Sequence, residues 1–69
     1  MKDILKIVAI NIKKERLKQG LTQENLAFKA GLHTNYIGLI ERRKRSVTVV
    51  ALQKIAEALN VEIIKLLKD

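Results

Sequence analysis

The chain has 69 residues, with 14 Lys and Arg against 7 Asp and Glu, so its formal net charge is +7 at pH 7. It contains no cysteine, which excludes a disulfide framework and a cysteine-ligated metal site. Its apolar runs are far too short to cross a bilayer. A chain of this length predicts one small, marginally stable domain, residues 1–69.

The positive charge is confined to one part of the chain. Residues 1–45 hold eleven Lys and Arg against Asp3, Glu15, Glu24 and Glu41, whereas residues 46–69 hold three basic and three acidic residues. A basic part suits an anionic partner, and a neutral, apolar part suits a protein partner.

Periodic apolar residues along the whole chain predict an all-α fold. The first helix is expected from about Asp3 to Gln19, with Asp3 as its N-cap and Gly20 as its stop. Its inward stripe would consist of Leu5, Val8 and Ile12. Lys6 and Asn11 interrupt its apolar start, and no small-residue cleavage site follows. We therefore expect a retained helix rather than a signal peptide, and a cytoplasmic protein.

The stretch from Gln23 to Arg42 has the pattern of two short helices joined by a tight turn. The first is expected over Gln23–Ala30 with Thr22 as its N-cap, and Gly31 would end it in the left-handed conformation. The second would begin after Leu32, with His33 or Thr34 as its cap. The inward positions are Leu26, Ala27, Ala30, Leu32, Ile37 and Ile40. This pattern indicates a helix-turn-helix, which lays its second helix in the DNA major groove, although an ordinary helical hairpin is the alternative.

Two further helices are expected after the basic run Arg42–Arg45. Thr48 would cap a helix that ends near Leu59, where Asn60 takes the left-handed conformation. A short last helix is expected over about Glu62 to Lys68. The inward positions of these two helices would be Leu52, Ile55, Ala56, Leu59, Ile63, Leu66 and Leu67.

From about Ile12 to Leu67 the chain resembles the Cro/repressor-type, or XRE, helix-turn-helix family. The resemblance is carried by Arg16, Gly20–Glu24, Leu26–Ala27, Gly31–Leu32, Tyr36–Ile37, Ile40–Arg42, Leu52, Ile55–Ala56 and Ala58–Val61. It implies a compact five-helix bundle of the lambda-repressor-like type, which binds operator DNA as a homodimer. It also implies a structural salt bridge between Arg16 and Glu41.

Within this family the stretch TNYIGLIERRKRSVTV is similar to the controller proteins of restriction–modification systems. Those are short regulators of their own promoter and of the endonuclease gene. Gly38 departs from the family pattern, where a polar residue such as Ser is usual. We expect it to be exposed on the recognition helix, where Gly costs about 1 kcal/mol relative to Ala.

Three residues are candidates for contacts with DNA bases. Thr34 and Asn35 would open the second helix of the motif, the end that meets base edges. Asn can bond adenine N6 and N7 together, and the Thr methyl group can touch a thymine methyl. Leu39 lies one turn further on the same side and would also suit thymine methyls, unless it packs against the following loop.

Other polar residues are candidates for contacts with the DNA backbone. Gln23, as the first residue of its helix, can offer a backbone N–H and its amide to a phosphate. Tyr36 could direct its hydroxyl to a phosphate or a base, or pack between helices. The remaining candidates follow the recognition helix and are Arg42, Arg43, Lys44, Arg45, Ser46 and Thr48.

The neutral end predicts a two-fold dimer interface. Val50 and Ile64 are β-branched residues displaced from the inward stripes of their helices, and Leu67 lies near Ile64. A phage-type repressor or an antitoxin, whose apolar surface binds a different protein, is the alternative. RNA polymerase is a further candidate partner, with Glu57 and Glu62 as acidic residues that could meet it.

The sequence offers no catalytic constellation, because it has one His, one Ser, no Cys and few carboxylates. We therefore expect no enzymatic activity, no metal, no cofactor and no small-molecule ligand. A basic amphipathic membrane binder would leave the helix-turn-helix corner unexplained.

Overall fold

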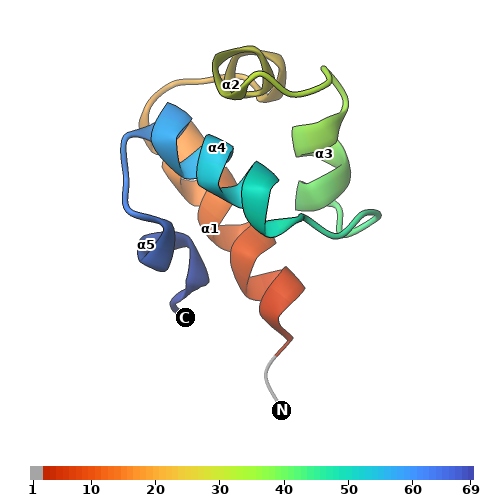
Figure 1. Ribbon diagram of the computed structural model, residues 1–69, viewed down its shortest axis with the longest axis vertical. Coiled ribbons are helices and arrows are strands. Elements are labelled where there is room, and N and C mark those ends of the chain that lie inside the picture. The colour runs from red at the N-terminus through yellow and green to blue at the C-terminus, as the bar shows by residue number, and fades with distance from the viewer. Residues whose placement is uncertain (1–2) are drawn as a thin grey trace.

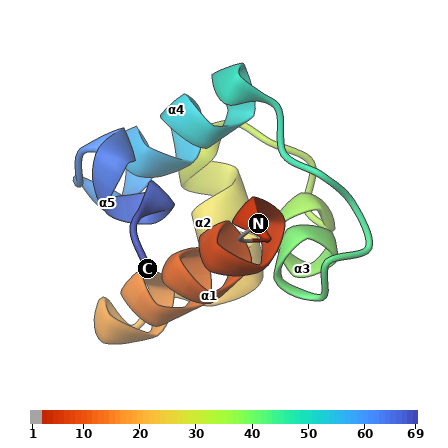
Figure 2. The same ribbon diagram turned by 90° about the horizontal axis from the view of Figure 1, so that it is seen from below.

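The computed structural model describes residues 3–69, and these form five helices and no strand (Figure 1). The helices are α1 (Ile4–Lys18), α2 (Gln23–Ala30), α3 (Tyr36–Glu41), α4 (Val49–Leu59) and α5 (Ile63–Leu67). The predicted all-α, five-helix fold is thus confirmed. Helices α3 and α5 lie on opposite sides of the pair α1 and α4 (Figures 1 and 2). No helix within residues 3–69 is long and apolar enough to cross a membrane.

Short-range hydrogen bonds set most helix boundaries. Asp3, Thr22 and Thr48 each accept a hydrogen bond from the backbone N–H three residues later, which satisfies a donor that the first turn leaves free. Asn25 completes a capping box with Thr22. Gly31 and Asn60 end their helices with φ values of 69° and 57°, so both left-handed ends are as predicted.

One hydrophobic core joins all five helices. Its buried members are Val8, Ile12, Leu26, Ala27, Ala30, Ile37, Ile40, Leu52, Ile55, Ala56, Leu59 and Leu66. The predicted inward position Leu5 is only half-buried, and the prediction that Leu67 faces inward was wrong, because Leu67 is exposed. The buried face of α1 contains Val8 and Ile12, as predicted, and also Ala9, Glu15 and Arg16, of which Arg16 meets α3 and Glu15 meets α5.

Polar side chains on α1 and at its C-cap hold the C-terminal helices in place. Asn11 donates from Nδ2 to the carbonyl oxygens of Leu66 and Lys68, at 3.0 and 2.6 Å. Gln19 donates from Nε2 to the carbonyl oxygen of Leu59 at 2.7 Å. These bonds satisfy carbonyl groups at the ends of α5 and α4 that have no partner within their own helices.

The start of α3 differs from the prediction. His33 and Thr34 do not cap the helix, because the helix begins at Tyr36 and Asn35 is its N-cap residue. Tyr36 N donates to the carbonyl of His33 at 2.9 Å, which closes a turn, and the first helical bond runs from Leu39 N to the carbonyl of Asn35 at 3.1 Å. Asn35 N also donates to His33 Nδ1 at 3.2 Å. Thr34 and Asn35 consequently lie in the turn that leads into α3.

Candidate nucleic-acid interface

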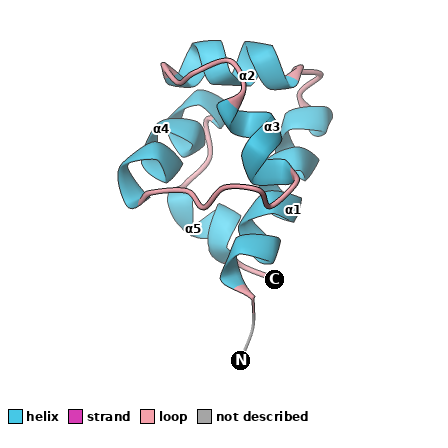
Figure 3. Cartoon of the chain, turned by 90° about the vertical axis from the view of Figure 1, so that its right-hand side faces the viewer, coloured by secondary structure: helices cyan, strands magenta, loops and turns pink. Residues whose placement is uncertain are grey.

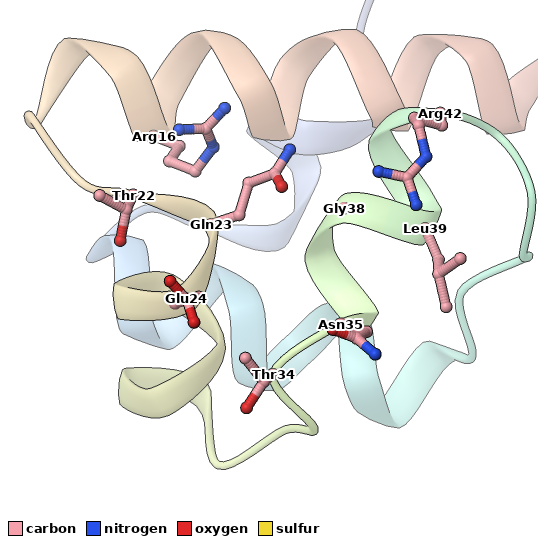
Figure 4. Close-up of a pocket in the computed structure, with 9 residues that line it drawn as sticks. All are labelled: Arg16, Thr22, Gln23, Glu24, Thr34, Asn35, Gly38, Leu39 and Arg42. Atoms are coloured by element: carbon pink, nitrogen blue, oxygen red, sulfur yellow. The ribbon is translucent and has the colours of Figure 1, made fainter.

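A polar hollow of about 530 Å³ lies between the start of α2 and the outer side of α3 (Figure 4). Thr34 and Asn35 border it from the turn before α3, and both side chains are exposed. Leu39 borders it one turn further along the helix and is half-buried. The structure thus brings the three predicted base-contacting residues together on one side of the recognition helix.

The predicted ion pair of Arg16 with Glu41 lies directly behind this hollow. Arg16 donates to both carboxylate oxygens, from Nε at 2.8 Å and from Nη2 at 3.0 Å. Its Nη1 donates to the carbonyl of Leu21 at 2.9 Å. The side chains of Arg16 and Glu41 are only 8% and 4% exposed, so solvent screens the pair little. The pair joins α1 to α3 and fixes the recognition helix on its scaffold.

Gln23 does not extend into solvent. Its Nε2 donates to Glu41 Oε1 at 3.0 Å, so the first residue of α2 is bound to α3 through the same carboxylate that holds Arg16. This hydrogen bond was not anticipated, because the side-chain amide of Gln23 was expected from the sequence to contact a phosphate. Its backbone N–H remains one of the free donors of the first turn.

The expectation that Gly38 is exposed was wrong. Gly38 is buried, because the side chains of Gln23 and Arg42 lie over it (Figure 4). Glycine has no Cβ, so these two side chains can lie directly against the backbone of α3 and cover it.

The basic residues after α3 are distributed over two sides of the molecule. Arg42 borders the polar hollow with Asn35 and Leu39. Arg45 places its guanidinium carbon 5.5 Å from the ring centroid of the half-buried Tyr36, a cation–π distance. Arg43 instead borders a second hollow with Lys6 and Lys13 of α1, and its φ of 58° is left-handed. Lys44, Ser46 and Thr48 are exposed and lie between α3 and α4. Figure 3 shows the loop that connects these two helices.

Several large apolar residues of α1, α4 and α5 are exposed. Val50, Ile64 and Leu67, the predicted dimer residues, are 66%, 53% and 39% exposed. Leu67 borders an apolar hollow of about 210 Å³ together with Ile4 and Val49, which are also exposed. Ile4 and Val49 were not among the predicted interface residues.

Comparisons with known proteins agree with this geometry. A family model described as Helix-turn-helix (HTH_3) matches residues 12–66. The control protein C.SmaI of Serratia marcescens is 46% identical over 65 residues, which cover 94% of this chain and 77% of that protein. The crystal structure of the restriction–modification controller protein C.AhdI from Aeromonas hydrophila has a TM-score of 0.86 and 39% identity, covering 90% of this chain and 94% of that one. The structure of C.Esp1396I bound to a 25 base pair operator site has a TM-score of 0.85 and 39% identity, covering 96% of this chain and 87% of that one.

Proposed function

The chain belongs to the helix-turn-helix family HTH_3, and from this premise we propose that it is a sequence-specific, homodimeric transcription regulator. Its operator would lie at its own promoter, as expected for the controller of a restriction–modification system. The similarity to C.SmaI and to the operator-bound C.Esp1396I supports this proposal. Such a regulator would bind DNA in the cytoplasm and would not be an enzyme.

The observation that carries the proposal is the joint exposure of Thr34 and Asn35 at the start of α3, in the same hollow as Arg42. In a helix-turn-helix complex the N-terminal part of the recognition helix meets base edges in the major groove. Asn35 would bond adenine N6 and N7, and the methyl groups of Thr34 and Leu39 would touch thymine methyls. These contacts would discriminate between sequences.

Affinity would come mainly from contacts with phosphates, which carry no sequence information. The first turn of α2 offers the backbone N–H of Gln23, aided by the helix dipole. The hydroxyl of Tyr36 and the exposed loop would add further contacts. The proposed loop contacts are Arg42, Arg43, Lys44, Arg45, Ser46 and Thr48. Because several cations are involved, binding should weaken steeply as the salt concentration rises.

A two-fold dimer would place one α3 in each of two successive major grooves, about 34 Å apart along the DNA. The exposed apolar surface of Val50, Ile64 and Leu67 supports such an interface. The same surface is the observation that favours the second candidate function, an antitoxin or phage-type repressor that binds an unrelated protein there. RNA polymerase remains a proposed partner, which Glu57 and Glu62 would meet.

A gel-shift titration tests the proposal. The probe is the DNA immediately upstream of the protein's own reading frame, with excess random duplex, at two salt concentrations. We expect a discrete complex that survives the competitor and contains two subunits per site. A smear that competitor and salt abolish would contradict sequence-specific regulation. Co-purification of a stoichiometric unrelated protein would then favour the antitoxin hypothesis.

A further inference from the structure

Gly38 is the point where three elements of the interface meet. Gln23 from the start of α2 and Arg42 from the end of α3 both lie over it, and Gln23 continues to Glu41, which Arg16 holds on α1 (Figure 4). We infer that Gly38 is a positioning residue for operator binding: its missing side chain seats Gln23 on Glu41 and so fixes the start of α2 relative to α3. This inference rests on the proposed function, because it concerns how the same DNA-binding site is assembled.

Any side chain at position 38 would collide with Gln23. A methyl group there would lie 2.9 Å from Gln23 Oε1 and 3.3 Å from Arg42 Nη1. The first distance is too short for a carbon and an oxygen that are not bonded, so one of the two groups has to move. Gln23 Oε1 is at the end of a flexible side chain, whereas α3 is held by the buried pair of Arg16 and Glu41. The side chain of Gln23 would therefore swing away and lose its hydrogen bond to Glu41.

The consequence for DNA binding follows from where Gln23 lies. As the first residue of α2 it carries the backbone N–H proposed to meet a phosphate, while α3 carries the base contacts. The hydrogen bond from Gln23 to Glu41 holds these two groups at a fixed separation. Without it, the capping box would still keep the first turn of α2 helical, but that turn would be held less firmly relative to α3, and binding would have to restore its position.

Helix propensity gives an independent reason to expect a role for this glycine. Gly has a lower helix propensity than Ala, and in a helix of only six residues such as α3 one unfavourable residue matters more. A Gly38→Ala variant should therefore fold as well as the wild type or better. A loss of operator binding in a variant of undiminished stability would point to positioning rather than to unfolding.

The experiment is a double-mutant cycle with Gly38→Ala and Gln23→Ala, measured by operator titration. We expect each single variant to bind the operator about tenfold more weakly, the difference that ~1.4 kcal/mol makes. The double variant should bind no more weakly than either single variant, because both substitutions break the same contact. The side-chain amide resonances of Gln23 should also shift in Gly38→Ala, as observed by NMR of the free protein.

Three results would overturn the inference. Gly38→Ala could bind as tightly as the wild type, or it could lose the same factor in the Gln23→Ala background as in the wild-type background, which would indicate a direct clash with DNA. It could also leave the Gln23 amide resonances unchanged. None of these three results would contradict the proposed function, provided that the wild-type protein still binds its operator. If the wild type itself does not select the operator from random duplex, the proposed function fails and the inference fails with it.

Discussion

Asn35 is exposed in the turn before α3 and its side chain makes no capping hydrogen bond, so its side-chain amide can meet a base. Asn35→Ala should cost roughly 1–3 kcal/mol of binding at a single base pair and relax the preference there. The measurement is a set of titrations against operators that each carry one altered base pair. Gln53→Ala, which removes an exposed amide from α4, serves as the control and should not change the affinity for any of these operators. An equal loss on every operator would make Asn35 a backbone contact.

Arg42 and Arg43 are neighbours with different surroundings, so we expect their substitutions to have different effects on stability and on operator affinity. Arg42 borders the hollow of the recognition helix, whereas Arg43 faces α1 and has a left-handed backbone. Arg43→Gly should raise the free energy of unfolding by about 0.5–1 kcal/mol, because relief of the left-handed strain exceeds the entropy cost of glycine. It should reduce operator affinity less than Arg42→Gln does. Urea unfolding measures the stability of Arg43→Gly, and operator titration measures the affinities of both variants. An Arg43→Gly variant that is less stable than the wild type would contradict the strain argument.

At the scale of the elements, the pair of Arg16 and Glu41 is the main polar link between α1 and α3. Glu41→Gln keeps the shape of the side chain but leaves the cation of Arg16 buried without its counter-charge. The expected loss of unfolding free energy is ~3–5 kcal/mol, a large part of the stability of so small a domain. Equilibrium urea unfolding measures it. Glu24→Gln removes an exposed carboxylate from α2 and should lower the free energy of unfolding far less. Similar losses for both variants would show that the buried pair contributes no more to stability than an exposed carboxylate does.

The boundaries of most helices, though not the start of α3, could be predicted because they depend on local chemistry. Thr22 and Thr48 cap the helices that follow them through bonds to residues three positions away, and Gly31 and Asn60 end helices by their own φ preference. The acceptors of Asn11 lie 55 and 57 residues away, so no local pattern indicates them. The bonds of Asn11 depend on α5 lying beside α1 in the fold.

The candidate site shows the same division between local and distant effects. Thr34, Asn35 and Leu39 could be grouped from the register of one helix-turn-helix motif. The burial of Gly38 could not, because it results from Gln23 on another helix and Arg42 at the helix end. The resemblance to a family indicated only that Gly38 was unusual. The physical reason for it required the positions of side chains on α2 and α3 together.

At the scale of the whole molecule, the proposed DNA contacts lie on α2, α3 and the loop after α3, whereas the exposed apolar residues Val50, Ile64 and Leu67 lie on α4 and α5. A dimer of such a chain would bind two half-sites at once, so the second contact would be effectively intramolecular. Disrupting the apolar surface should therefore weaken operator binding without touching any proposed DNA contact. This connection between association and affinity distinguishes a dimeric regulator from a monomeric basic domain.

Val50→Lys is the substitution that tests this connection. Val50 is 66% exposed, so a lysine there should leave the fold of the subunit intact while placing like charges against each other across a two-fold interface. We expect a monomer by sedimentation and an operator affinity lower by about 10²-fold or more. The added positive charge cannot cause that loss, because charge alone strengthens binding to DNA. Leu17→Lys is the matched control: it adds the same charge at a residue of α1 that is 57% exposed, and it should remain dimeric and bind normally. A Val50→Lys protein that is still dimeric would place the interface elsewhere, and a monomer with unchanged affinity would show that one subunit is sufficient for the operator.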